Sequence, residues 1–305
     1  MALLHGDNRL SRGFIVVAVL WILAALSALV LIYLTFVTNT AVVVAASTER
    51  IKADLLATAG VELAAYQLTA VSPEGRPSSG TFNVRIGGAL VAVTFRSEAA
   101  RIDLNAAPKG LLAGLMVGLG VAPANAADYA DRIVAWRTPG QGGEDDPETS
   151  SYRTAGLAYA PRHAPFPSAE ELWLVRGIPP FVVERMLPFV TAFSNMASVN
   201  IADAAPQVLA ALPGMSPERL QAVVAQRADP RLDRRALPGV AGGGAATLDA
   251  SRAYRVAVAT TFEGGRRSAA EAVILLLDEG DDPYRVLSWR NAADGSTAPQ
   301  RTASR

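Results

Sequence analysis

A long uncharged apolar run near the N-terminus constrains this chain more than any other feature. Residues 14–48 contain no Asp, Glu, Lys or Arg, and FIVVAVLWILAALSALVLIYLTFV (residues 14–37) also lacks Pro and Gly. About 20 such residues in a helix cross the hydrocarbon core of a bilayer. A cleaved secretory signal has a shorter apolar region that ends in small residues before a loop. We therefore expect a membrane-spanning helix that stays in the protein, and the simplest interpretation is a signal anchor that holds a globular domain at the membrane.

The helical pattern continues beyond the apolar run. The segment ERIKADLLATAGVELAAYQLTA (residues 49–70) carries Leu56, Ala59 and Leu63 at helical spacing, and Pro73 marks a stop. Residues 14–70 are therefore predicted to form one helix, about 85 Å long at about 1.5 Å per residue.

Charges before the apolar run predict its orientation. Arg9 and Arg12 precede the run and are expected to stay on the cytoplasmic side under the positive-inside rule. Everything after about residue 40 then lies on the far side of the membrane.

The composition of the 305 residues excludes several classes of protein. Lys and Arg number 28, as do Asp and Glu, so no global field draws the chain to nucleic acid. The sequence has no cysteine, which excludes disulfides, thiolate zinc sites and a cysteine nucleophile. Half of the residues are apolar, which is enough for a core, and the length leaves room for one to three domains.

Alternating patterns on both sides of a helical region predict an α+β fold. TFNVRI and ALVAVTFR are predicted strands with a tight turn at Gly87-Gly88, and YRVAVATTFE, AEAVILLL and YRVLSW are predicted strands near the C-terminus. Residues 105–227 have a helical pattern, and residues 228–250 are rich in Pro, Gly and Ala and indicate a loop. This order favours a helical domain inserted into an α+β framework.

The helical region contains an internal repeat. IDLNAAPKGLLAGL (residues 102–115) and VNIADAAPQVLAAL (residues 199–212) each combine a strand-like entry, a polar cap and a Leu-rich helix. After the second copy, Gly214 suits a turn, Ser216 an N-cap and Pro217 the first helical position. We therefore expect two small helical subdomains.

A third piece has a related pattern. ELWLVRGIPPFVVERMLPFV (residues 171–190) is predicted as helix, glycine turn and helix, with Ser168 and Glu171 forming a capping box before it.

The helix–turn–helix units are similar to helix-hairpin-helix modules, which bind DNA backbone. Arg176, Arg219 and Arg227 favour DNA binding. Acidic residues stand among them, however, and the chain has no net positive charge, so we expect helical packing without affinity for nucleic acid.

One acidic cluster offers oxygen ligands. Glu144, Asp145 and Asp146 lie in the Gly-rich run GGEDDPE, where they are candidate calcium ligands. Their spacing is not that of an EF-hand, and the alternative is a solvated loop with no cofactor required.

Catalysis has little support in the sequence. The only histidine after residue 5 is His163, in the proline-rich PRHAPFP, and no hydrolase, zinc-protease or phosphate-loop motif is present. We expect a protein that is not an enzyme.

The start of the chain resembles a type IV prepilin processing site. A short polar leader, residues 1–13, ends in Arg12 and Gly13, and Phe14 follows as the first residue of the apolar helix. The resemblance implies that a prepilin peptidase cuts between Gly13 and Phe14 and that Phe14 is then N-methylated. Most pilins have a glutamate at the fifth mature position, where this chain has Ala18. A filament tip is where a subunit without that carboxylate is expected.

Nearly the whole chain resembles the GspK family, the large minor pseudopilin of type II secretion. The resemblance rests on the processing site and on RIDLNAAP, ADRIVAWR, GGEDDPETSSY, APFPSAEELWLVRGI and VNIADAAPQVLAALPGM, in that order. It implies a pseudopilin fold, with a long N-terminal helix packed on an antiparallel sheet and a large inserted helical domain of SAM-like or helix-hairpin-helix-like repeats. Ala202 stands where an asparagine is usual in the family.

The resemblance also implies a role, partners and a location. The protein is expected at the tip of a periplasmic pseudopilus, in complex with two other minor pseudopilins of the I and J types, where it initiates assembly and supports export across the outer membrane. It would be a single-pass protein of the inner membrane, with its C-terminal domain in the periplasm. The alternative is a membrane-anchored DNA receptor of the competence type. The expected division is leader 1–13, N-terminal helix 14–70, pseudopilin strands 71–104, inserted helical domain 105–197, second repeat and linker 198–250, C-terminal strands 251–290 and flexible tail 291–305.

Overall fold

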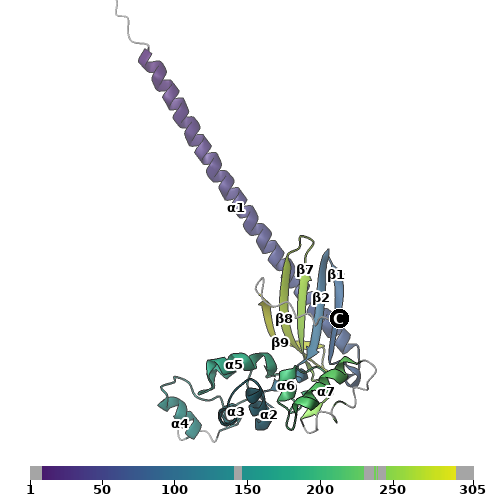
Figure 1. Ribbon diagram of the computed structural model, residues 1–305. Helices are drawn as coiled ribbons and strands as arrows, with labels where there is room; N and C mark the ends of the chain where they lie inside the picture. The colour runs from purple at the N-terminus through teal and green to yellow at the C-terminus, as the bar shows by residue number, and fades with distance from the viewer. Residues whose placement is uncertain (1–8, 141–145, 230–236, 238, 240–244, 293–305) are drawn as a thin grey trace, which may run out of the picture. The chain divides into compact units, whose positions relative to one another are not determined.

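The structure is a computed structural model that describes residues 9–140, 146–229, 237, 239 and 245–292 (Figure 1). The chain divides between Leu56 and Ala57 into two units. The described part of the first unit is helical and belongs to α1 (Arg9–Thr69), and the second unit contains the end of α1 and the rest of the fold. The long helix predicted over residues 14–70 is therefore confirmed. It begins at Arg9, five residues earlier than predicted.

Five antiparallel strands form one sheet in the second unit, in the order β1-β2-β7-β8-β9. All of the strands predicted from alternating patterns are confirmed. Gly87 and Gly88 connect β1 to β2 with φ values of 54° and 83°, which is the positive region that a two-residue hairpin turn requires. The strands are β1 (Ser79–Ile86), β2 (Ala89–Ser97), β7 (Ala253–Thr261), β8 (Arg267–Leu276) and β9 (Tyr284–Ala292).

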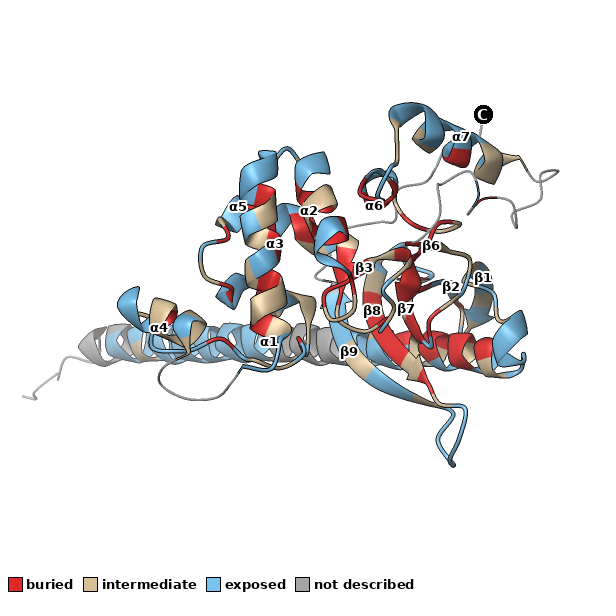
Figure 2. Cartoon of the chain, turned by 90° about the horizontal axis from the view of Figure 1, so that it is seen from below, coloured by how far each residue is buried: buried red, intermediate tan, exposed pale blue. Residues whose placement is uncertain are grey.

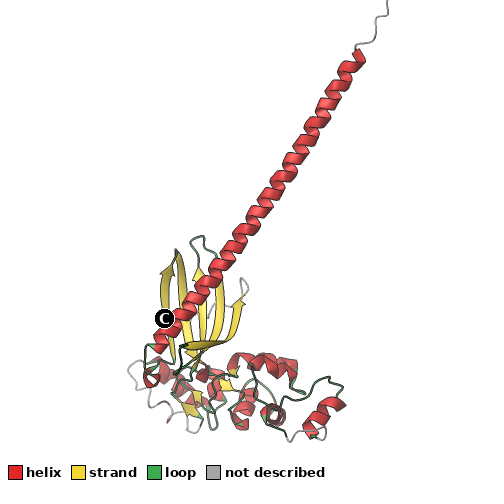
Figure 3. Cartoon of the chain, turned by 180° about the vertical axis from the view of Figure 1, so that it is seen from behind, coloured by secondary structure: helices red, strands yellow, loops and turns green. Residues whose placement is uncertain are grey.

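The C-terminal part of α1 lies across one face of this sheet (Figure 3). Its buried side chains share one helix face and are Ala57, Val61, Ala64, Ala65 and Leu68. A Cβ atom at Gly60 would lie 2.8 Å from a methyl group of Val258 and 3.2 Å from one of Val93. Small residues on α1 therefore allow the helix to pack close to the sheet.

The helical region is an insertion between two neighbouring strands. β2 ends at Ser97, which pairs with Tyr254 near the start of β7, so the intervening residues leave and return at the same end of the sheet (Figure 1). The turn that follows α1 lies at this end too, because Tyr254 Oη donates a hydrogen bond to the carbonyl of Pro77, 3.2 Å away. The insertion is thus placed at the end of the sheet where α1 ends.

Two copies of one motif build the insertion, as the repeat at 102–115 and 199–212 predicts. In each copy a short strand is followed by two helices, and a second short strand then pairs with the first in parallel. The first copy comprises β3 (Ile102–Asp103), α2 (Lys109–Gly118), α3 (Pro123–Arg137) and β4 (Val190–Thr191). The second comprises β5 (Val199–Asn200), α6 (Pro206–Ala210), α7 (Pro217–Ala228) and β6 (Ala246–Thr247). The first copy also holds α4 (Pro147–Thr154), α5 (Pro180–Met186) and the 3-10 helices η3 (Ala169–Leu174) and η4 (Leu187–Phe189).

One predicted helix start is confirmed and another is wrong. Ser216 caps α7, since its Oγ accepts a hydrogen bond from the amide of Arg219 at 3.3 Å. Ser168 makes no such bond, and the element after it is the 3-10 helix η3 instead of an α-helix. The capping box fails because the Glu171 carboxylate pairs with Arg162 at 3.0 Å instead of turning back to the helix start.

A single hydrophobic cluster runs through both repeats and accounts for much of the buried surface in Figure 2. It includes Trp136, which is buried, whereas Trp173 and Trp289 are exposed. The two copies approach closely where α2 meets α6. A Cβ atom at Gly114 would lie only 2.5 Å from the carbonyl oxygen of Ala211.

Candidate functional site

A 23-residue segment within α1, Phe14–Phe36, is the only described helix long and apolar enough to cross a membrane. At about 1.5 Å per residue it extends about 34 Å, which matches a hydrocarbon core of about 30 Å. None of it is buried in protein, and Trp21 is 74% exposed. A helix with apolar side chains on every side needs lipid or other helices around it. This segment therefore fits a transmembrane anchor.

The Gly13–Phe14 junction lies at the boundary between the polar leader and this segment. The helix α1 begins before the junction and continues through it. Phe14 is the first residue of the candidate span, so a cut before it would leave the whole span in the mature protein. Cleavage at this bond and methylation of Phe14 remain predictions.

Of the three candidate calcium ligands in the run GGEDDPE, the structure describes only Asp146. Glu144 and Asp145 lie outside the described residues. Asp146 caps α4, since its Oδ2 accepts a hydrogen bond from the amide of Thr149 at 2.8 Å. That bond, with a smaller contribution from His163, lowers the pKa of the Asp146 carboxyl. Over the described ranges, no three His, Asp or Glu residues gather as metal ligands. Calcium binding by the run remains a prediction.

His163 joins the two ends of the loop that carries this run. Its Nδ1 lies 3.2 Å from the carbonyl oxygen of Thr138 at the end of α3, and its Nε2 lies 3.2 Å from Asp146 Oδ2. The Thr149 hydroxyl also faces Nε2, at 3.4 Å. In a catalytic triad the nucleophile and the carboxylate contact opposite ring nitrogens. Here both contact the same one, so the geometry is that of a loop contact.

An arginine holds the loop before α2 in the first repeat. Arg137, the last residue of α3, donates hydrogen bonds to the carbonyl oxygens of Leu104 and Ala107, the second at 2.6 Å. Asp103 completes the loop, because its Oδ1 accepts from the amide of Asn105 at 2.7 Å. The loop is therefore fixed by two side chains from opposite ends of the repeat.

In the second repeat an arginine holds the corresponding loop in the same way. Arg227, near the end of α7, donates to the carbonyl oxygens of Ile201 and Ala204, the second at 2.8 Å. Asn200 takes the place of Asp103, and its Oδ1 accepts from the amide of Ala202 at 2.9 Å. Burial lowers the pKa of the Arg227 guanidinium. The sequence pattern alone did not pair these arginines with their carbonyls.

These contacts bear on the three arginines that favour DNA binding. Arg227 binds its own repeat, and Arg219 donates to the carbonyl of Gly214 at 2.9 Å. Two of the three guanidinium groups thus bind main-chain carbonyls of the protein. The described helical region therefore offers no continuous row of unpaired basic side chains from these positions.

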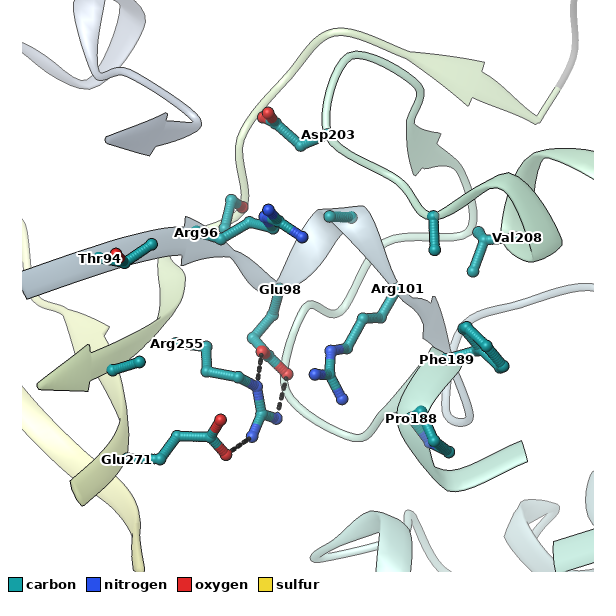
Figure 4. Close-up of a pocket in the computed structure, with 14 residues that line it drawn as sticks. Thr94, Arg96, Glu98, Arg101, Pro188, Phe189, Asp203, Val208, Arg255 and Glu271 are labelled. Carbon is teal, nitrogen blue, oxygen red and sulfur yellow. Dashed lines mark hydrogen bonds and ion pairs between the residues drawn. The ribbon is translucent and has the colours of Figure 1, made fainter. Parts of the chain in front are cut away.

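A cluster of charged residues lies where the insertion joins the sheet (Figure 4). Arg255 donates to both carboxylate oxygens of Glu98, from Nε at 2.8 Å and from Nη2 at 3.1 Å, and also pairs with Glu271. Glu98 is 1% exposed. Burial alone would raise the pKa of Glu271, but Arg255 and Arg290 outweigh it and lower this pKa. Sequence reasoning missed the cluster because its members are far apart in the chain. Charged residues inside apolar strands were the available signal.

Comparison with known families identifies part of the chain. Residues 82–195 match the family model for "Type II secretion system (T2SS), protein K". The chain carries a type II secretion protein K domain. The matched segment runs from β1 through the first repeat to the residues after β4. The resemblance to protein K in the sequence is thereby confirmed. Members of this family are structural components of the secretion apparatus, and the family is not a family of enzymes.

One solved structure has a fold similar to that of this chain. A chain of the GspK-GspI-GspJ complex from the type 2 secretion system of enterotoxigenic Escherichia coli matches with a TM-score of 0.56. The two sequences are 18% identical, and the match covers 81% of this chain and 98% of that one. At this identity the likeness establishes the fold, which confirms the predicted α+β class with a long N-terminal helix on an antiparallel sheet. Comparison with curated proteins finds no matching relative.

Proposed function

We propose that the chain is a minor pseudopilin at the tip of the type II secretion pseudopilus, where it initiates assembly and supports protein export across the outer membrane. The observation that carries this proposal is the protein K domain at residues 82–195, on a fold whose first helix contains the apolar segment Phe14–Phe36. The role is structural and requires no cofactor.

The proposed location follows from the anchor and its flanks. Phe14–Phe36 crosses the inner membrane once, with Arg9 and Arg12 on the cytoplasmic side and the C-terminal domain in the periplasm. A prepilin peptidase cleaves between Gly13 and Phe14, and Phe14 becomes the N-methylated first residue.

Two features support the tip position. The insertion lies at the end of the sheet where α1 ends, where it would occupy the space that a following subunit needs. Ala18 stands where a carboxylate would otherwise neutralise the buried amino terminus of a neighbouring subunit. A subunit with nothing above it needs neither the space nor the carboxylate.

We propose that its partners are minor pseudopilins of the I and J types, since the similar solved chain belongs to a complex of GspK, GspI and GspJ. The test is purification of the tagged full chain from membranes, followed by mass spectrometry. Recovery of both partner types is the expected result. If neither is enriched over an untagged control, the proposal is wrong.

The alternative role, a membrane-anchored DNA receptor, predicts salt-sensitive binding to duplex DNA. Since Arg219 and Arg227 bind main-chain carbonyls, we expect no retention of duplex DNA in a filter-binding assay at physiological salt. Binding at micromolar protein, with a salt dependence that indicates several phosphate contacts, would favour the receptor.

Calcium at the acidic run is a separate proposal. Asp146 Oδ2 already accepts the α4 capping bond, so a cation at Glu144 and Asp145 would share this carboxylate with the helix start. Calcium titration of the full chain, with Glu144→Gln as the comparison, tests it. An equal thermal shift in both proteins would rule out this site.

A further inference from the structure

A cavity of about 190 Å³ lies where the insertion meets the sheet (Figure 4). A single buried water needs only about 10–15 Å³, so the cavity has room for a small ligand. One part of its wall is charged and includes Arg101, Arg255 and Glu98. Another part is apolar and includes Phe189 and Val208.

Arg101 is a partly buried cation whose guanidinium has no direct partner. Its side chain extends into the cavity (Figure 4). Within the described part of the chain, its guanidinium makes no hydrogen bond and no ion pair. Burial, together with the positive charge of Arg255, lowers the pKa of Arg101 to about 10 despite the attraction of Glu98 and Glu271. A buried charge without a partner is costly, and an anion beside it would offset that cost.

Two of the neighbouring carboxylates are engaged elsewhere. Glu98 accepts hydrogen bonds from Arg255 and from the hydroxyl of Thr191. Glu271 pairs with Arg255 and with Arg290, the latter at 3.2 Å. Arg255 is therefore paired with these two carboxylates, which leaves the partly buried Arg101 as a cation available to a ligand.

The third carboxylate that lines the cavity is engaged as well. Asp203 accepts hydrogen bonds from the hydroxyls of Ser78 and Ser79, the second at 2.7 Å. Arg96, which also lines the cavity, is exposed, and its guanidinium makes no hydrogen bond or ion pair with another described residue. It provides a second positive charge for an entering anion.

We propose that this cavity binds a carboxylate on a short apolar stem, with Arg101 holding the carboxylate and Phe189 and Val208 contacting the stem. The planar guanidinium matches a carboxylate through two parallel hydrogen bonds. The ligand carries one negative charge, because the three arginines and the three carboxylates that line the cavity balance one another, and a dianion such as phosphate would add a larger excess of negative charge. The group comes either from a free small acid or from an acidic side chain of a bound protein. This proposal is independent of the tip assignment.

The test is the melting temperature of the full chain in detergent, with two probes. Sodium propanoate represents a free acid, and a capped tripeptide with one central glutamate represents a protein side chain. Sodium chloride at equal ionic strength is the reference. At about ten times the dissociation constant, a bound ligand raises the melting temperature by about 3–6 °C. A larger rise with propanoate identifies a free acid as the source, and an equal or larger rise with the peptide identifies a side chain.

Variants of the cation make the result specific. Arg101→Met removes the charge and keeps an apolar stem, so it should abolish the rise while the ligand-free melting temperature stays equal or increases. Arg85→Met removes an exposed charge on β1 and should keep the full rise. Arg101→Lys keeps a cation without the planar fork and should reduce the rise. The proposal is overturned if neither probe acts on the wild-type protein, or if Arg101→Met responds as the wild type does.

Discussion

Arg137 and Arg227 show how single residues fix the two repeats. Each lies near the end of the second helix of its repeat and donates to two carbonyls in the loop before the first helix. Neither α2 nor α6 has a side-chain N-cap, since Pro108 and Ala205 occupy those positions. The arginines do not replace an N-cap, because they donate and cannot accept from the first helix amides, but they fix the loops that lead into these helices.

Arg137→Gln should destabilise the protein by about 2–4 kcal/mol, because it removes two charge-assisted hydrogen bonds and leaves two carbonyls without donors. Urea unfolding followed by tryptophan fluorescence measures the change. Arg85→Gln, at an exposed position on β1, is the matched control and should change the stability by less than about 0.5 kcal/mol. Equal effects of the two variants would show that the hydrogen bonds of Arg137 contribute no stability.

Acid should weaken the junction between insertion and sheet. Burial opposes ionisation of Glu271, but Arg255 and Arg290 hold its pKa below the ordinary 4.5. A depressed carboxyl pKa adds stability above the unfolded value, and this stability is lost as the pH falls through the folded value. We therefore expect the free energy of unfolding to decrease as the pH falls below about 4.5. Glu271→Gln should be less stable at neutral pH and lose less on acidification; an unchanged pH profile would contradict this assignment.

At the scale of elements, local patterns predicted the strands and much of the helical content. The Gly87-Gly88 turn between alternating residues identified the β1–β2 hairpin, because few other residues adopt positive φ at both positions. The region around Ser168 was predicted wrongly, since a capping pattern cannot reveal that Glu171 pairs with Arg162. The cluster of Glu98, Arg255 and Glu271 was not predicted at all, because sequence period gives the face of a strand and not its partners.

The packing of α2 against α6 makes opposite predictions for two glycines of one helix. Gly114→Ala should destabilise the protein by about 1–3 kcal/mol, because the new Cβ would meet the main-chain oxygen of Ala211. Gly110→Ala adds a Cβ into open space on the same helix and should be neutral or stabilising by up to about 1 kcal/mol. Urea unfolding of both variants measures the difference. Similar values would mean that the two repeats do not pack closely there.

At the scale of the whole molecule, the leader and the anchor predict a processing step. Replacing Gly13 with a bulky residue should leave the leader attached and block filament assembly while membrane insertion continues, because the span begins at Phe14 and is unchanged. N-terminal sequencing and membrane fractionation measure the two outcomes. A mature protein that begins at a residue other than Phe14 would contradict the prepilin assignment.

The space beyond the sheet and the residue at position 18 bear on the number of copies per filament. A subunit inside a helical array needs free space beyond its sheet and a carboxylate for its neighbour's amino terminus. Here the insertion occupies the sheet end where α1 ends, and Ala18 replaces the carboxylate. We therefore expect one copy of the chain per filament.

Ala18→Glu should be tolerated or mildly harmful in a secretion assay, and not activating. No subunit above presents an amino terminus to the new carboxylate, and an unpaired carboxylate in lipid is costly. Quantitative mass spectrometry of purified filaments measures the copy number directly. A value comparable to that of the major subunit would place the chain inside the array and rule out the tip.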